Sequence, residues 1–285
     1  LDAIEQATGE KEVNAVGYCL GGTLLMATQA YLAAKKDTRI QSATCFTTML
    51  DFSEPGELEV FIDEDQIASL EKAMDERGFL DGSEMATTFN MLRANDLIWS
   101  FFINNYLLGK EPFPFDLLFW NSDSTRMPAK MHSFYLRNMY LENNLVKPNG
   151  ITLNGRKIDL RKVKAPVYFL STIEDHIAPW RSTYAGTQFT GGPVKFVLGG
   201  SGHIAGVINP PEKQKYGYWT NDKLPADPRE WFEDAKKSDG SWWLDWAGWV
   251  EPFGGEKVAA RVPGDGKLEV IEDAPGYYVK HGLIK

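Results

Sequence analysis

A cysteine flanked by glycines, close to the first residue, constrains the fold more than any other feature of this sequence. The residues Gly-Tyr-Cys-Leu-Gly-Gly at 17–22 follow a strand-like stretch at 13–16 and precede a run of helix-forming residues at 23–35. Glycines that flank a nucleophile at a strand-to-helix turn form the nucleophile-elbow pattern. The pattern predicts that Cys19 attacks an acyl group and carries it as a thioester, rather than serving as a buried structural thiol.

The remaining chain alternates between strand-like and helix-like segments, which predicts an α/β-hydrolase fold: a mostly parallel sheet flanked by helices. Further strands are expected at 40–48, 166–172 and 194–198. The intervening residues 52–150 are first acidic and then rich in aromatic side chains, which is typical of a helical lid inserted over an active site. We therefore divide the chain into a nucleophile-elbow part of the core (1–51), the lid insertion (52–150), and the remaining core with its Trp-rich C-terminal helices (151–285).

A cysteine nucleophile needs a base, and the base needs an acid that orients it. Cys19, Asp175 and His203 occur in the order nucleophile, acid, histidine that α/β-hydrolases use. Asp175 and His203 follow two expected strands that are joined by one helix, so both should lie at the sheet edge where the elbow points. Asp51 also follows an expected strand and is the rival for the acid. The backbone N–H of Leu20 would supply one oxyanion donor.

Composition and charge exclude several classes of function. The net charge is −9 without a basic run, so a nucleic-acid partner is not expected. No stretch approaches the roughly 18 apolar residues of a membrane span. The two cysteines form no Cys-x-x-Cys pair, which suits a reducing compartment with free thiols. The four histidines lack metal-ligand spacing with one another or with a cysteine, so a zinc site is not expected.

Other conspicuous residues are expected to be structural. Cys45 lies within an apolar strand and should belong to the core. His132 and His281 are expected at the surface. Six of the nine tryptophans lie between positions 219 and 249, and three of them have i, i+4, i+7 spacing: Trp242, Trp246 and Trp249. This spacing favours helix packing over an apolar tunnel or a partner surface.

Longer motifs resemble the polyhydroxyalkanoate synthases, and specifically the single-subunit type that uses short-chain hydroxyacyl-CoA. The motifs are GYCLGG at 17–22, TTMLDF at 47–52, FDLLFWN at 115–121, EDHI at 174–177, SGHIAGVINPP at 201–211 and GSWW at 240–243. They follow one another over essentially the whole chain, and chance does not easily place so many in the family's order.

The resemblance implies a function. Cys19 would carry the growing polyester as a thioester, and His203 would deprotonate it. With Asp175, His203 would activate the 3-hydroxyl of the incoming (R)-3-hydroxyacyl-CoA, with release of coenzyme A. The resemblance further implies a homodimer without metal or cofactor, which works at polymer granules in the cytoplasm and has a lid that gates the site.

The sequence departs from the family's pattern at its beginning. An elbow strand normally follows several earlier strands and a loop that gives the second oxyanion donor. Those N-terminal strands are missing from this sequence, so we expect the chain alone to be weakly active or inactive. Two other functions stay open. One is a cysteine-elbow hydrolase of the thioesterase or dienelactone-hydrolase kind, and the other is a non-catalytic granule-binding module.

Overall fold

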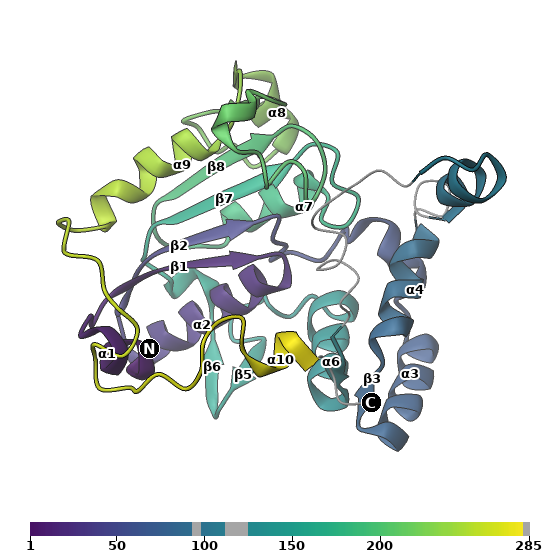
Figure 1. The fold of residues 1–285 in the computed structure, drawn as a ribbon, viewed down its shortest axis with the longest axis horizontal. Helices are drawn as coiled ribbons and strands as arrows, with labels where there is room; N and C mark the ends of the chain where they lie inside the picture. The colour runs from purple at the N-terminus through teal and green to yellow at the C-terminus, as the bar shows by residue number, and fades with distance from the viewer. Residues whose placement is uncertain (93–97, 112–124, 282–285) are drawn as a thin grey trace.

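A six-stranded sheet with helices on both faces forms the centre of the molecule (Figure 1). The computed structural model describes residues 1–92, 98–111 and 125–281. The strand order is β1-β2-β7-β8-β9-β10, in which β1, β2, β7 and β8 are parallel, β9 is antiparallel to β8, and β10 is antiparallel to β9. The strands of this sheet are β1 (Val13–Tyr18), β2 (Ile40–Phe46), β7 (Val167–Thr172), β8 (Val194–Gly199), β9 (Tyr218–Thr220) and β10 (Lys236–Ser238). The expected strands thus form the predicted parallel sheet.

Helices follow the strands as the alternation predicts. The helices are α1 (Asp2–Thr8), α2 (Leu20–Lys35), α3 (Glu64–Arg77), α4 (Gly82–Leu92), α6 (Ala129–Tyr135), α7 (Trp180–Ala185), α8 (Pro228–Glu233), α9 (Trp243–Val250) and α10 (Gly276–His281). Within the described ranges, two short pairs of strands lie outside the main sheet: β3 (Phe79–Leu80) with β4 (Met127–Pro128), and β5 (Ile151–Leu153) with β6 (Arg156–Ile158). Among the described helices, none combines the length and apolar character needed to cross a membrane.

The alternation of side chains along β7 divides the core between the two faces of the sheet. Val167 and Phe169 pack in the cluster that includes residues of α2 and α7. Tyr168 and Leu170 point the other way and pack with the tryptophans of the C-terminal part. Every side chain of β7 is buried, as expected for a central strand of a parallel sheet.

The tryptophans at 242, 246 and 249 pack onto the sheet. The Trp246 indole N–H donates to the Thr44 hydroxyl at 3.0 Å, and the ring of Trp249 contacts that of Tyr168 at 5.2 Å between centroids. Tyr168 also donates a hydrogen bond to Asp245 of α9. Helix packing, rather than a tunnel, is therefore the role of these residues.

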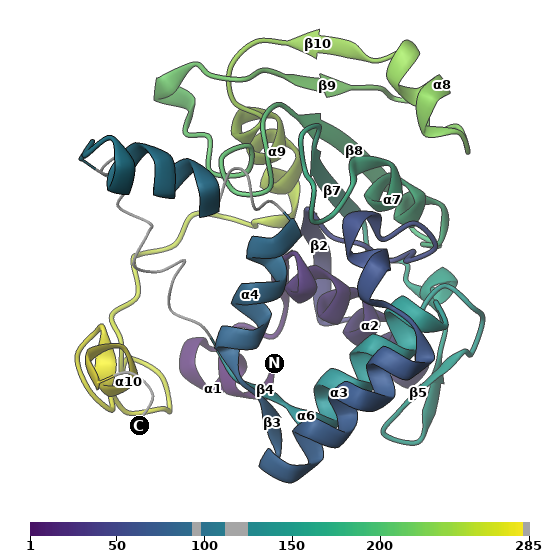
Figure 2. The same cartoon turned by 90° about the vertical axis from the view of Figure 1, so that its right-hand side faces the viewer.

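A group of helices lies between β2 and β7 in the sequence and stands beside the core (Figure 2). α3 and α6 pack together around Met74, Leu80 and Ala129. Arg137, which follows α6, bonds Glu64 and Glu71 of α3 and so fixes the two helices to each other. The motif at 115–121 lies outside the described residues.

Candidate active site

Cys19 occupies a sharp turn between β1 and α2. Its φ of 52° and ψ of −121° put a non-glycine residue in the left-handed half of backbone space, which is a strained conformation. The Cys19 N–H donates to the carbonyl of Phe46 at 2.8 Å, which ties the turn to the end of the neighbouring strand β2. The sequence thus forms the predicted elbow, and the structure shows its strain directly.

Two of the three glycines in the motif allow the turn to close. A Cβ on Gly17 would lie 2.5 Å from the Gly22 Cα, and one on Gly22 would lie 1.9 Å from the Thr48 hydroxyl oxygen. Gly21 differs, because a Cβ there would meet nothing within 4 Å. A side chain at position 21 would therefore not obstruct the turn. Close packing instead depends on Gly17 and Gly22.

Asp175 and His203 lie together at the carboxyl ends of β7 and β8. The His203 Nδ1 and an Asp175 carboxylate oxygen are 2.7 Å apart, and the two residues are only 9% and 7% exposed. The other Asp175 oxygen accepts the backbone N–H groups of Ile177 and Ala178 at 2.8 and 2.9 Å. These bonds hold the carboxylate in one orientation toward the imidazole.

The electrostatics of His203 favour its protonated form. Burial alone would lower the pKa of His203, but hydrogen bonds with Asp175 and Cys19 and the charges of both residues outweigh burial. The pKa rises from its ordinary 6.5 to about 9. Since Asp175 bonds Nδ1, the second ring nitrogen is the one available to Cys19.

Asp51, the rival acid, has a different role. It accepts a hydrogen bond from the Asn143 side chain at 2.7 Å, while the Asn143 oxygen accepts the backbone N–H of Phe52 at 3.0 Å. Asp51 therefore ties the segment after β2 to the end of the helical insertion. The structure brings Asp175, and not Asp51, to His203.

A cavity of about 570 Å³ opens beside Cys19 and extends under the inserted helices. Leu20 and Cys19 form part of its base. Its other walls are largely apolar and come from the segment after β2 and from the inserted helices, with Met49, Leu58, Phe61, Leu70, Met85, Phe89 and Leu136 among them. A reacting group at Cys19 would thus meet an apolar environment on the side of the insertion.

Two tyrosines add polar groups to this apolar wall. Tyr135 and Tyr140 line the cavity, and their rings are edge-on at 5.4 Å between centroids. Burial raises the pKa of both phenols, and Cys19 contributes to the rise in each case. Both hydroxyls therefore stay protonated and can act as hydrogen-bond donors near the nucleophile.

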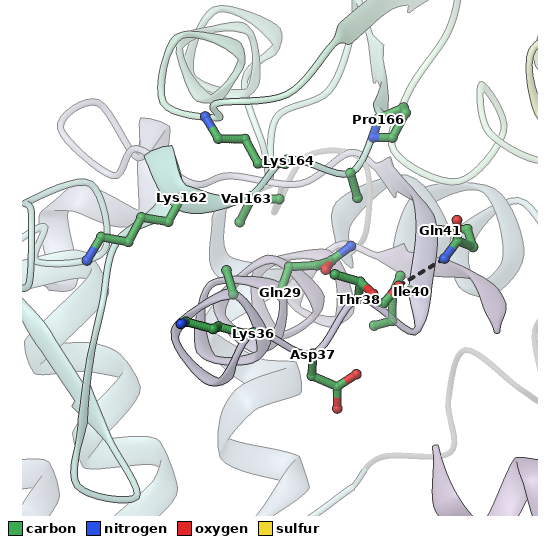
Figure 3. A pocket seen from close by; sticks show the side chains of 12 residues that line it. Gln29, Lys36, Asp37, Thr38, Ile40, Gln41, Lys162, Val163, Lys164 and Pro166 are labelled. Atoms are coloured by element: carbon green, nitrogen blue, oxygen red, sulfur yellow. Dashed lines mark hydrogen bonds between the residues drawn. The ribbon is translucent and has the colours of Figure 1, made fainter. Parts of the chain in front are cut away.

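A second cavity, of about 400 Å³, lies where β2 and β7 begin, at the edge of the sheet opposite to Cys19 (Figure 3). Gln29 and Ile40 are among the residues that line it. The amine ends of Lys162 and Lys164 extend away from the middle of this group (Figure 3). This second cavity lies at the opposite ends of the strands from Cys19, and its lysines point away from it, so it does not contribute to acyl chemistry at Cys19.

Comparison with known proteins agrees with this geometry. Residues 1–210 match the family model for the alpha/beta hydrolase fold. The chain belongs to the α/β-hydrolase family. An α/β-hydrolase uses an elbow nucleophile with an acid and a histidine from later loops. In this chain Cys19 lies at the elbow, and Asp175 and His203 lie in the loops that follow β7 and β8.

Curated relatives carry a more specific name. The chain is 57% identical over 279 residues to the "Poly(3-hydroxyalkanoate) polymerase subunit PhaC" of Rhizobium etli, covering 98% of this chain and 44% of that protein. It is 52% identical to the "Poly(3-hydroxyalkanoate) polymerase" of Methylorubrum extorquens, covering 98% of this chain and 46% of that protein. The resemblance inferred from the motifs is therefore confirmed, and the chain spans about half the length of these relatives. Among solved structures, a monoacylglycerol lipase of Paleococcus ferrophilus matches 71% of this chain and 63% of its own, at 18% identity and a TM-score of 0.39.

Several features of this α/β-hydrolase site differ from the sequence-based expectations or were missed. His132 was expected at the surface but is only 4% exposed and lines the cavity, because α6 turns it inward. His281 is exposed, as expected. Tyr135 and Tyr140 were not singled out. Their i, i+5 spacing in an aromatic segment resembles ordinary core packing, so no sequence signal separated them from it.

Proposed function

We propose that the chain is the catalytic region of a polyester synthase, which polymerises (R)-3-hydroxyacyl-CoA through a thioester on Cys19. The observation that carries the proposal is the paired Asp175 and His203 beside a strained cysteine elbow that opens into an apolar cavity. The names of the curated relatives support the choice of substrate. The proposed reaction needs no metal or other cofactor, because every proton transfer uses His203.

In the first step, the Cys19 sulfur attacks the carbonyl carbon of an acyl-CoA. The bond from that carbon to the sulfur of coenzyme A breaks, and the departing thiolate takes a proton from the His203 imidazolium. The backbone N–H of Leu20 donates to the oxyanion that forms in between. The acyl group is then bound to Cys19, and His203 is neutral.

In the second step, neutral His203 removes the proton from the 3-hydroxyl of an incoming hydroxyacyl-CoA. The hydroxyl oxygen attacks the thioester on Cys19, an ester bond forms, and the carbon–sulfur bond to Cys19 breaks. Cys19 then attacks the extended acyl-CoA and releases coenzyme A, so that the chain grows by one unit. Asp175 keeps the proton of Nδ1 facing itself, which leaves the other nitrogen free to act as the base.

The apolar cavity supports transfer to an alcohol rather than to water. A thioester on Cys19 would react with water if water had free access to it. Residues such as Phe61, Met85 and Phe89 surround the space where the acyl chain would lie. A bound polyester chain would fill this space and exclude water, whereas a hydrolase needs a water molecule at the thioester.

Mass spectrometry after incubation with 3-hydroxybutyryl-CoA tests the proposal. We expect hydroxybutyryl adducts on Cys19 that disappear in Cys19→Ala and persist in Cys45→Ala, since Cys45 is fully buried in β2. Insoluble polyester together with free coenzyme A supports the synthase, whereas free hydroxy acid indicates a thioesterase. Granule binding without any adduct would indicate a non-catalytic module.

We also propose that the chain works as a homodimer at the surface of polyester granules in the cytoplasm. Exposed apolar side chains on the inserted helices support this proposal. They are Ile98, Trp99, Phe101, Phe102, Ile103, Tyr106, Leu107 and Leu108. Sedimentation velocity tests the dimer, and co-flotation with purified granules tests the association. A monomer that stays in the soluble fraction would contradict both.

A further inference from the structure

Tyr18 connects the strand of the nucleophile to the loop of the histidine. It is the last residue of β1 and precedes Cys19 directly. Its hydroxyl donates a hydrogen bond to the backbone carbonyl of His203 at 2.5 Å. Its ring stands edge-on to the imidazole of His203, with centroids 5.4 Å apart and an angle of 75° between the planes. One side chain thus contacts both the backbone and the ring of His203.

The loop that carries His203 needs such a connection. Glycine is frequent in it, at 200, 202 and 206, and Ser201 has a φ of 69°. Glycine-rich backbone has more conformational freedom than other backbone, so its position depends on bonds to its surroundings. The carbonyl of Ser201 accepts the N–H of Glu174, and the carbonyl of Gly206 accepts the indole N–H of Trp242. These bonds join the loop to other parts of the site, whereas Tyr18 joins it to β1.

We propose that Tyr18 is a positioning residue, which holds His203 at the right place relative to the Cys19 sulfur through the His203 backbone carbonyl. This inference rests on the proposed function, in which His203 exchanges a proton at Cys19. Asp175 fixes the orientation and tautomer of the ring, while Tyr18 fixes where the backbone of the residue lies. A displacement of about 1 Å at a proton-transfer contact is enough to slow the reaction strongly.

The surroundings keep the Tyr18 hydroxyl in its donor form. Burial raises the pKa of Tyr18 well above its usual range, and the charges of Cys19 and Asp175 act in the same direction. The phenol therefore stays protonated at every pH at which His203 changes its charge. The hydrogen bond from Tyr18 to the His203 carbonyl therefore persists when His203 takes up or loses a proton.

The Tyr18→Phe variant tests the inference, because it keeps the ring contact and removes only the hydroxyl. The measurement is the rate of Cys19 alkylation by iodoacetamide between about pH 5 and pH 10, on the 285-residue chain and with the adduct located by mass spectrometry. Cys45 is fully buried and does not interfere. We expect alkylation near pH 7 to be roughly 3–10-fold slower, the size of effect that one lost hydrogen bond produces. The pH profile should shift toward that of His203→Ala.

Tyr184→Phe is a matched control. The Tyr184 hydroxyl also donates to a backbone carbonyl, that of Pro225, at 2.5 Å. Tyr184 belongs to α7 and packs in the core on the α2 and α7 side of the sheet, away from Cys19 and His203. We expect Tyr184→Phe to alkylate like the parent chain, even where its thermal midpoint falls. Unchanged alkylation in Tyr18→Phe, or equal slowing in both variants, would overturn the inference.

The alkylation assay uses no acyl-CoA, so its outcome separates the two proposals. A Tyr18 effect without any acyl adduct on Cys19 would contradict the synthase and leave the positioning role intact. Normal acylation with no Tyr18 effect would contradict the positioning role alone.

Discussion

Replacing Asp175 by asparagine should move the proton of the neutral His203 imidazole from Nδ1 to the other ring nitrogen, while the backbone stays in place. The asparagine side-chain oxygen can still accept the hydrogen bonds from the N–H groups of Ile177 and Ala178, because these N–H groups donate to the Asp175 oxygen that does not bond the His203 ring. Its NH₂ group would then face Nδ1 of His203, where the carboxylate now lies at 2.7 Å. A donor at that place forces the proton onto the other nitrogen, which can then no longer accept the proton of the thiol or the hydroxyl.

The magnitude follows from the pKa of His203. Its rise from 6.5 to about 9 corresponds to roughly 3 kcal/mol of preference for the imidazolium, supplied by Asp175 together with Cys19. This raised pKa stabilises the fold fully below pH 6.5, and the stabilisation is lost as the pH rises through about 9. Burial lowers the pKa of His203, and in Asp175→Asn no carboxylate opposes this effect. The pKa of His203 should therefore fall toward 6.5 or below. Acylation of Cys19 should slow by about 10⁴-fold, as for the corresponding change in a serine-protease triad.

Two measurements check this prediction. The ring-proton NMR signals of His203 give its pKa, and urea unfolding at pH 6 and pH 9.5 gives the free energy of unfolding. Asp51→Asn is the control, because Asp51 bonds Asn143 and does not contact His203. A His203 that still titrates near 9 in Asp175→Asn would refute the reasoning, as would an equal shift in Asp51→Asn.

Two further perturbations test the packing around the site. Gly22→Ala should lower the free energy of unfolding by about 3 kcal/mol, because the new Cβ would overlap the side chain of Thr48. Gly21→Ala should change the free energy of unfolding by less than about 1 kcal/mol, because a Cβ at this position meets free space. Urea unfolding of both variants and the parent chain measures these differences. Hydrogen bonds from Arg137 lower the pKa of Glu71 from 4.5 to about 2, so Glu71 stabilises the fold above pH 4.5 and loses this effect as the pH falls toward 2. Glu71→Gln should remove that part of the acid sensitivity, and a thermal midpoint that depends on pH as in the parent chain would contradict the assignment.

The parts of the fold that depend on local patterns could be predicted from the sequence. The buried strands are short apolar runs, and the elbow is a contiguous motif, so β1, β2, β7 and β8 were expected close to their observed bounds. The pairing of Asp175 with His203 followed from strand order. Contacts between distant segments could not be read in this way. The burial of His132 and the different roles of Gly21 and Gly22 depend on which neighbours the folded chain supplies.

The register of the parallel strands explains why residues so far apart in sequence meet at one place. Tyr18 is paired with Phe46, Phe46 with Leu170, and Thr172 with Gly199, so β1 and β2 end level with each other, and β7 and β8 end level with each other two residues further along. The loops that follow them must therefore emerge side by side, and the nucleophile, the acid and the histidine lie on the first, third and fourth of these loops. A shift of one strand by two residues would move its loop by about 7 Å and separate the groups. The hydrogen bonds of the sheet, rather than the loops themselves, thus determine the coarse geometry. Bonds such as that from Tyr18 to His203 complete it.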